Sequence, residues 1–396
     1  MDDLTGQIGV GKIRGSNYKG KRVSTATAFL NPVRERKNVF VLKSTVTDRV
    51  VIDETKTVKG VKVTLKNGDT STFYVRKEVI LSAGAVNTPT LLMLSGIGPK
   101  THLQELGITV ISDLAVGENL QDHVRIPIPV VIKTGAKPKD EQFWAMATAQ
   151  YLIDQTGPHS TNFDQPNINA FLSVPDGKIL PDVQIDHNYF VPNTSYVYSG
   201  CTNIMSLEEN ICKQIADMNT DGELLIFFVS LCRPISRGNI LLRSAKGKDD
   251  PKIYSKYFSD KRDMDIYVKN IKRLMDIIDT PTFKQMKAEL KRINYEDCDK
   301  MEFPSDEYWE CMARVVTYNV YHPVGTAKMG MDGDPTAVVD NRLRVFGVKG
   351  LRVVDASIMP TITSINTNAP TMMIAERAAD FIKSDYNIIN NVKDEL

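Results

Sequence analysis

The sequence predicts a mixed α/β fold, with α+β character, in two domains. A length of 396 residues with 42% hydrophobic residues is enough for a large core. Glu78–Ala85 is an apolar run that ends in small residues and leads into a helical pattern from about Thr88 to Leu94. Leu351–Val354 is a second short apolar run. Short apolar strands that lead into a helix are typical of open α/β sheets, whereas residues 125–319 mix strands with helices and are expected to form the second domain.

The composition excludes several classes of function. The formal net charge is +1 and both signs are spread through the chain, so neither nucleic acid nor an anionic membrane is expected as a partner. The five cysteines form no CxxC pair and have no metal-like spacing to histidine, so we expect mostly free or core thiols and no metal. They are Cys201, Cys212, Cys232, Cys298 and Cys311.

The two ends of the chain give ambiguous targeting signals. Residues 1–6 are acidic and lack an apolar segment, so no signal peptide is predicted. No apolar run approaches the ~18 residues of a membrane span, and the longest, Leu224–Leu231, suits a buried strand. The last four residues, Lys-Asp-Glu-Leu, match an endoplasmic-reticulum retention address that is read only inside the lumen. A chance match or a relic of a longer precursor is favoured, and localisation stays open.

Glycine and asparagine mark the turns of the first 75 residues. Gly9-Val10-Gly11-Lys12-Ile13-Arg14 lacks the third glycine of a dinucleotide-binding turn, so a glycine-rich loop is favoured. A strand is expected over Val39–Leu42. A hairpin is expected from strands at Thr57–Leu65 and Thr70–Val75, because both residues of Asn67-Gly68 tolerate positive φ.

The middle block carries alternating and helical apolar patterns. Strands are expected at Ile126–Lys133, Leu224–Leu231 and Asn239–Arg243, and a core-packed helix over Asp265–Asp279. Asp182–His187 alternates like a half-buried strand, and His187 is expected to be structural rather than part of a pocket.

One histidine and one amide near the carboxyl end of the chain are the candidate reacting groups. His322 precedes a turn at Gly325, and its imidazole could accept a proton near neutral pH. Asn366 could hold a hydroxyl by a hydrogen bond. A helix is expected from Asn368, which could cap it, with Pro370 in its first turn and a face formed by Met373, Ile374, Ala378, Phe381 and Ile382. Its amino end would stabilise an anion.

Four sequence motifs carry a family resemblance. They are Tyr321-His322-Pro323-Val324-Gly325-Thr326, Gly84-Ala85-Val86-Asn87-Thr88-Pro89, Val116-Gly117-Glu118-Asn119-Leu120-Gln121-Asp122-His123 and Leu351-Arg352-Val353-Val354-Asp355-Ala356-Ser357. These motifs resemble the glucose-methanol-choline (GMC) flavoprotein oxidoreductases, most closely the insect glucose-dehydrogenase and ecdysone-oxidase branch. The resemblance covers nearly the whole chain. It implies an incomplete FAD-binding Rossmann-like domain and a substrate domain with an antiparallel sheet and helices.

The resemblance also assigns the site residues. It implies that His322 and Asn366 are catalytic, and that FAD is the cofactor. It implies FAD contacts from Val46, Ala83, Gly84, Ala85, Asn119, Asp355, Ala356, Asn366, Thr367 and Asn368. His123 is expected to be structural, because the motif's catalytic histidine is His322. Ile365, where a small residue usually stands, is expected either to narrow the pocket or to tilt Asn366.

Two functions from different classes follow. The first is an FAD-dependent oxidoreductase that acts on a CH–OH group of a small-molecule alcohol, sugar or sterol, with residues 1–124 and 320–396 in the FAD domain and 125–319 in the substrate domain. The second is a truncated, flavin-free product that binds only small molecules or a partner. It is motivated by the expected absence of the first βαβ unit and its Gly-rich turn. Substrate identity, the electron acceptor and the oligomeric state cannot be read from the sequence.

Overall fold

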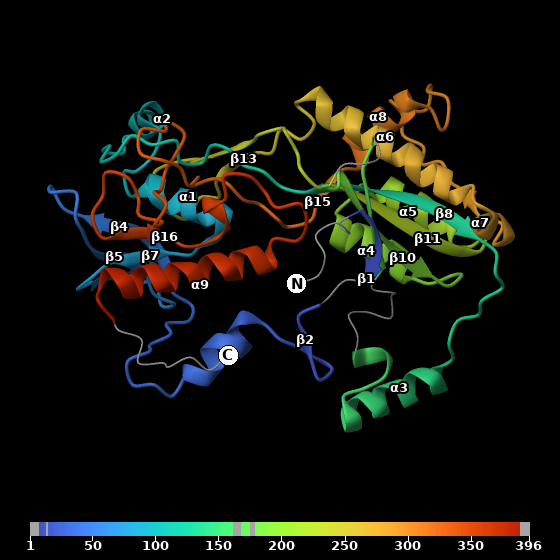
Figure 1. Ribbon diagram of the computed structural model, residues 1–396, viewed down its shortest axis with the longest axis horizontal. Helices are drawn as coiled ribbons and strands as arrows, with labels where there is room; N and C mark the ends of the chain where they lie inside the picture. The colour runs from blue at the N-terminus through green and yellow to red at the C-terminus, as the bar shows by residue number, and fades with distance from the viewer. Residues whose placement is uncertain (1–7, 13–14, 161–167, 175–178, 389–396) are drawn as a thin grey trace. The chain divides into compact units, whose positions relative to one another are not determined.

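The computed structural model describes residues 8–12, 15–160, 168–174 and 179–388 (Figure 1). Ile13, Arg14 and the Lys-Asp-Glu-Leu tail lie outside the described residues, as does the acidic start of the chain. The chain divides into two compact units. Unit 1 contains residues 1–41, 124–232 and 261–319, and unit 2 contains residues 42–123, 233–260 and 320–396. Residues 1–41 therefore group with the middle block and residues 233–260 with the two flanking blocks.

Unit 1 is built on an antiparallel sheet of seven strands. The order is β1-β9-β10-β11-β8-β14, and β15 also pairs with β8. The strands are β1 (Gly9–Lys12), β9 (Ile168–Leu172), β10 (Val183–Phe190), β11 (Glu223–Leu231), β8 (Val124–Ile132), β14 (Glu289–Leu290) and β15 (Tyr318–Asn319). All nine residues of the central strand β11 are buried, which confirms the strand expected from the longest apolar run.

Helices and a small hairpin complete unit 1. The helices are α3 (Glu141–Asp154), α4 (Tyr196–Gly200), α5 (Glu209–Met218), α6 (Lys261–Ile278), α7 (Pro281–Gln285) and α8 (Asp306–Val316), and the hairpin is β2 (Asn17–Tyr18) with β3 (Lys21–Arg22). Short turns of helix lie at Ala26–Leu30, Asn31–Val33, Pro158–Ser160 and Cys201–Met205. On α6, Ile271, Leu274 and Ile278 are buried, as the helical spacing predicted, because these positions share one face; Met275, predicted on the same face, is half-buried.

The expectation of mostly free thiols is wrong. Cys201 is bonded to Cys212 and Cys298 to Cys311, with sequence separations of 11 and 13 residues. Cys232 is buried. Each bond closes a short loop within unit 1 and, on the chain-entropy model, stabilises the fold by about 3 kcal/mol. Spacing alone did not reveal the pairs, because the tertiary fold brings the cysteines of each pair together.

Unit 2 contains the parallel strands. β7 (Val79–Leu81) pairs in parallel with β16 (Leu351–Val353), and β4 (Val46–Ile52), β5 (Val58–Thr64) and β6 (Thr70–Tyr74) form an antiparallel sheet. β12 (Asn239–Leu241) pairs with β13 (Lys252–Tyr254). The helices are α1 (Gly84–Leu94), α2 (Lys100–Glu105), the short turn Ala356–Ile358 and α9 (Asn368–Asp385). The combination of both sheet types with helices confirms the predicted fold class.

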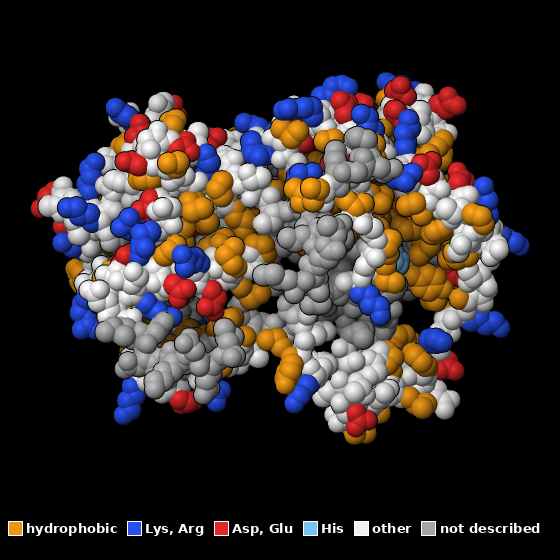
Figure 2. All heavy atoms as spheres, viewed as in Figure 1, with side chains coloured by type: hydrophobic (Ala, Val, Ile, Leu, Met, Phe, Trp, Pro, Cys, Tyr) orange, Lys and Arg blue, Asp and Glu red, His pale blue; other side chains and the backbone are white. Residues whose placement is uncertain are grey.

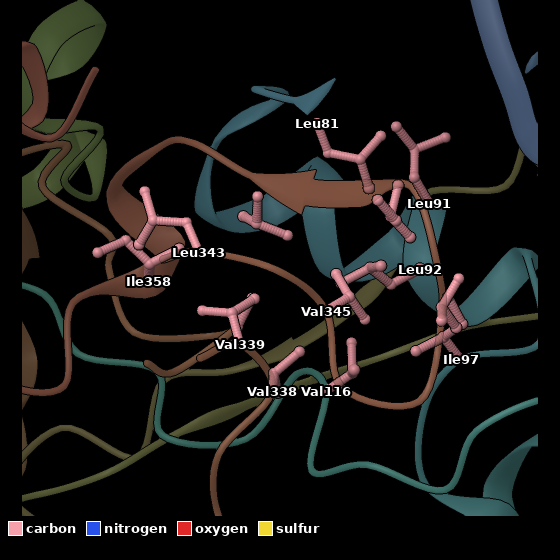
Figure 3. Packing of buried hydrophobic residues seen from close by; sticks show 14 of the residues in the cluster. Leu81, Leu91, Leu92, Ile97, Val116, Val338, Val339, Leu343, Val345 and Ile358 are labelled. Atoms are coloured by element: carbon pink, nitrogen blue, oxygen red, sulfur yellow. The ribbon is translucent and has the colours of Figure 1, made fainter. Parts of the chain in front are cut away.

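The core of unit 2 joins segments that are distant in the sequence (Figure 3). Leu81 of β7, Leu92 of α1 and Val353 of β16 pack in one cluster with Val339, Val345 and Ile358 from the carboxyl-terminal segment. Ile374 and Ala378 of α9 belong to the same cluster. Because α9 and both parallel strands share this core, the position of α9 relative to the strands is fixed.

The first 75 residues differ from their predictions in three places. Val39–Leu42 is not a strand, and Phe40 is 85% exposed, because β propensity cannot form a strand without a partner to pair with. Gly9–Lys12, expected to be a loop, is instead an exposed strand paired with β9. The β5–β6 hairpin is confirmed, but of its two turn residues only Gly68 has positive φ (90°). Two backbone hydrogen bonds close a three-residue loop: Gly68 N–H donates to Leu65 O, and Leu65 N–H donates to Asp69 O.

The described surface mixes both charges. Figure 2 shows Lys and Arg side chains interspersed with Asp and Glu on the face in view, in keeping with the formal net charge of +1. In the part of the chain that the structure describes, no helix is both long enough and apolar enough to span a membrane.

Candidate active site

His322 lies in an extended segment of unit 2 that runs beside residues 120–123. Gln121 and Val324 form an antiparallel bridge, and Val320 N–H donates to His123 O at 3.2 Å. The backbone N–H of His322 donates to Asp122 Oδ1 at 2.9 Å. Backbone bonds on both sides of His322 therefore fix its position.

Gly325 is required for the turn that follows His322. Its φ is +93°, and a Cβ at this position would lie 2.5 Å from Asn119 O and 2.8 Å from Asn119 Nδ2. Both the conformation and the close approach exclude a larger residue. The predicted turn after His322 is confirmed.

The His322 imidazole contacts a polar group at each nitrogen. Nδ1 lies 3.0 Å from His123 Nδ1, and Nε2 lies 3.3 Å from Asn366 Nδ2. His123 is 3% exposed, whereas Asn366 is exposed. One nitrogen of His322 therefore faces the interior and the other faces an accessible amide, so the structure brings together the two residues expected to react.

His123, which we expected to be structural, becomes a functional candidate through its contact with His322. Its Nε2 lies 2.9 Å from the backbone oxygen of Thr363, and its ring meets the His322 ring edge-on, at 88° with centroids 5.2 Å apart. Contact with His322 spans 199 residues of sequence, and no local pattern encodes it.

Asp122 is a buried carboxyl group that precedes His123 in the chain and accepts a hydrogen bond from the backbone N–H of His322. Burial raises its pKa to about 7, although the backbone N–H groups of His322 and His123 act in the opposite direction. The group is 6% exposed. The ionisation of this carboxyl group, which contacts the backbone of His322, therefore falls near neutral pH.

The amino end of α9 begins two residues after Asn366. Asn368, expected to be the cap, is instead the first helical residue, and Thr367 precedes the helix without a side-chain capping bond. Pro370 lies in the first turn, as predicted. Ile374 and Ala378 are buried as expected, but Met373 is 61% exposed. Asn368 is exposed, so this helix start presents uncapped N–H groups and the positive end of its dipole beside Asn366.

A second group of expected residues surrounds the start of α1. Asp355 Oδ2 accepts from Gly84 N at 2.9 Å and from Thr88 Oγ1 at 2.6 Å, while Oδ1 accepts from Ser357 N at 2.8 Å and Oγ at 2.5 Å. The Asp355 carboxylate thus ties the start of α1 to the end of β16. Ala85 O accepts from Thr326 Oγ1 at 2.6 Å, which joins this group to the segment of His322.

Gly84 provides an open approach to the chain at this point. Its φ is +82°, and nothing lies within 4 Å of a Cβ built there. Ala83 before it is exposed and Ala85 after it is buried. A ligand could therefore approach the backbone closely at this strand-to-helix turn.

The remaining expected residues have different surroundings. Asn119 Nδ2 donates to Gly325 O and Pro360 O at 3.2 Å each, and Oδ1 accepts from Arg237 Nε at 3.1 Å, so the side chain already holds the loop together. Ala356 O accepts from Gly325 N. Val46 is 60% exposed at the start of β4, and Ile365 is 45% exposed beside Asn366. Among the described residues, no cluster of His, Cys, Asp and Glu could hold a metal ion.

The fold and the site together define an α/β protein with a histidine–amide pair beside an uncapped helix start. Two GMC oxidoreductase family models match the chain, one over residues 2–125 and the other over residues 234–375. The chain belongs to the GMC oxidoreductase family, as the sequence motifs predicted.

Curated relatives support this assignment. The chain is 38% identical to ecdysone oxidase of Bombyx mori over 98% of the chain and 56% of that enzyme. It is 37% identical to the FAD- and quinone-dependent glucose dehydrogenase of Drosophila pseudoobscura pseudoobscura, over 97% of the chain and 59% of the relative. The chain therefore spans between half and two thirds of the length of these relatives.

Solved structures share the fold. A formate oxidase matches with a TM-score of 0.77 at 25% identity, over 96% of this chain and 66% of its own. An FAD-dependent oxidoreductase from Chaetomium thermophilum matches with the same TM-score at 24% identity, over 96% of this chain and 68% of its own. At this level of identity the second match reports on the fold alone.

Proposed function

We propose that this chain carries the catalytic half-site of an FAD-dependent oxidoreductase that acts on the CH–OH group of an alcohol, sugar or sterol. The observation that carries the proposal is the contact of 3.3 Å between His322 Nε2 and Asn366 Nδ2 at an accessible position beside the start of α9. A proton acceptor and a hydroxyl-binding amide at one point suit the activation of an alcohol.

The residues present fit a flavin. The uncapped start of α9, with Asn366, Thr367 and Asn368, would stabilise the negative charge of the pyrimidine edge of a reduced flavin. The open turn at Ala83–Ala85 would take the pyrophosphate side. Asp355 would contribute by holding that turn in its conformation, since its carboxylate oxygens already accept four hydrogen bonds. Ala356, Asn119 and Val46 would contribute from the flanking segments.

When bound, FAD supplies the hydride acceptor of the reaction. His322 Nε2 accepts the hydroxyl proton of the substrate, so the O–H bond breaks as a new N–H bond forms. Asn366 Nδ2 donates to the substrate oxygen and holds it against His322. We assign the substrate-facing role to unit 1 and the flavin-facing role to unit 2.

The alternative is a flavin-free product without catalysis. Membership of the GMC family and the intact pair of His322 and Asn366 favour the enzyme. The whole reaction remains a proposal, because the chain spans only 56% of the Bombyx mori relative.

The test measures bound flavin and turnover separately. We would express the chain as it stands and joined to the unmatched part of the Bombyx mori relative, and record flavin absorbance per protein and oxidation of an alcohol, sugar and sterol panel with a dye acceptor. His322→Ala should leave flavin content unchanged and lower kcat by about 10²–10⁴-fold with a smaller change in KM.

A matched control is His159→Ala, because His159 is an exposed histidine of unit 1. It should have wild-type turnover. Absence of flavin from both forms of the protein, or turnover unaffected by His322→Ala, would overturn the proposed function.

A further inference from the structure

The hydrogen bond between the two histidine rings has one donor nitrogen and one acceptor nitrogen. His123 Nδ1 and His322 Nδ1 are 3.0 Å apart. A neutral imidazole carries a proton on one nitrogen and a lone pair on the other, so in this contact one Nδ1 donates and the other accepts. The distance alone does not say which.

The backbone oxygen of Thr363 determines which of the two Nδ1 atoms donates. It lies 2.9 Å from His123 Nε2, and a carbonyl oxygen can only accept a hydrogen bond. His123 Nε2 therefore carries a proton. In neutral His123, which is buried (3% exposed), Nδ1 then has the lone pair.

The same reasoning fixes the proton on His322. Its Nδ1 must donate to the lone pair of His123, so neutral His322 has its own lone pair at Nε2. That nitrogen faces the Asn366 amide at 3.3 Å, on the accessible side. The chain of hydrogen bonds from Thr363 O through His123 thus leaves the basic nitrogen of His322 where a substrate hydroxyl would reach it.

We propose that His123 is a positioning residue that holds His322 in the tautomer with its proton on Nδ1 and its lone pair on Nε2. Its ring nitrogens contact Thr363 and His322, so its effect passes through His322. The role in catalysis depends on the proposed function, whereas the tautomer is a property of this chain and can be measured without turnover.

The surroundings hold this arrangement on both sides. The N–H of Ile362, next to Thr363, donates to Gln121 Oε1 at 3.1 Å, and Gln121 is two residues before His123. The backbone N–H of His322 is held by Asp122. Thr363, His123 and His322 therefore lie in three segments that hydrogen bonds join to one another close to these residues.

The arrangement also suits the proton transfer. When His322 Nε2 accepts a proton, Nδ1–H remains bonded to His123, and this bond becomes charge-assisted and stronger. Neither ring has to turn. In the opposite tautomer Nε2 would carry the proton and could not act as a base.

The direct test is nuclear magnetic resonance of the chain with ¹⁵N-labelled histidine, in which long-range ¹H–¹⁵N spectra distinguish the two tautomers. The sequence has five histidines, and His322→Ala and His123→Gln assign the two signals of interest. We expect neutral wild-type His322 to be protonated at Nδ1. Protonation at Nε2 in the wild type would overturn the proposal.

Two substitutions test the role of His123. His123→Phe keeps a ring but can neither donate nor accept, so His322 should lose its preference for the Nδ1–H tautomer. His123→Gln keeps a donor and an acceptor and should preserve the preference. An unchanged His322 tautomer in His123→Phe would also overturn the proposal. His159→Phe, the same change at an exposed histidine, is the control and should leave His322 unaffected.

Kinetics of the flavin-loaded protein supply the second readout. His123→Phe should lower kcat on the order of 10–100-fold, the loss found when the partner that orients a metal-bound imidazole is removed, with little change in KM and with flavin content retained. His123→Gln should retain most of the wild-type kcat. A wild-type kcat in His123→Phe would overturn the catalytic role, whereas a lack of activity in the wild type would count against the proposed function and leave the tautomer measurement valid.

Discussion

The carboxylate of Asp355 accepts a hydrogen bond of 2.9 Å from the backbone N–H of Gly84, 271 residues earlier in the chain. Each of its oxygens accepts from one backbone N–H and one hydroxyl, because Ser357 bonds to Oδ1 while Gly84 and Thr88 bond to Oδ2. One side chain therefore joins the ends of β7 and β16 at the turn to which we assign the pyrophosphate.

We predict that Asp355→Asn destabilises unit 2 by roughly 2–4 kcal/mol. An amide has only one acceptor oxygen, so in either orientation its NH₂ group faces a backbone N–H. Both tryptophans, Trp144 and Trp309, lie in unit 1, so hydrogen exchange of peptides from β7, α1 and β16 is the suitable measurement. Exchange in these peptides should accelerate. Asp332→Asn, at an exposed position, is the control, and equal protection in both variants would contradict the prediction.

Arg352 at the centre of β16 makes a buried ion-pair network. Its Nε lies 2.8 Å from Glu78 Oε2, its Nη2 contacts Asp385 at the end of α9, and the Arg352 and Glu78 side chains are 3% and 7% exposed. Arg352→Ala would leave Glu78 buried without its cation, so we predict a loss of about 3–5 kcal/mol.

The matched control for Arg352 is Arg344→Ala. Arg344 pairs with Asp340 at 2.7 Å, but its side chain is 52% exposed, so its removal should cost less than about 1 kcal/mol. Thermal melting followed by far-ultraviolet circular dichroism, which reports on both units, would compare the two. Similar melting curves for the two variants would show that burial does not decide the energy of these pairs.

The buried carboxyl group of Asp122 should make stability depend on pH. Its pKa is raised to about 7 in the folded chain from an ordinary value of 3.8, so the folded state binds its proton more tightly than the unfolded state does. The contribution of Asp122 to the free energy of unfolding is therefore fully present below pH 4 and is lost as the pH rises to 7. The loss is on the order of 4 kcal/mol.

Asp122→Asn removes this titration but keeps an oxygen for the N–H of His322. The melting temperature of the variant relative to the wild type should therefore increase between pH 4.5 and 7 and then remain constant. Melting curves at several pH values with circular dichroism provide the comparison. A constant difference across that range would mean that Asp122 titrates at its ordinary pKa.

The sequence determined the elements whose signals are local. The Asn67-Gly68 turn signal predicted the β5–β6 hairpin, and the apolar run predicted β11. The helical spacing of Ile271, Leu274, Met275 and Ile278 predicted the buried face of α6, of which Met275 is only half-buried. These patterns succeed because burial of one face or of a whole strand has to be encoded in neighbouring residues. The motif around His322 likewise predicted the family and the pairing with Asn366.

Only the tertiary structure decided the contacts between distant segments. The two disulfides, the strand partner of Gly9–Lys12 and the bond from Gly84 to Asp355 depend on which segments meet. The contact of His123 with His322 spans 199 residues. The tautomer inferred for His322 follows from the direction of a single backbone carbonyl at Thr363, and the orientation of a carbonyl is set by the folded chain rather than by the identity of the residue that carries it.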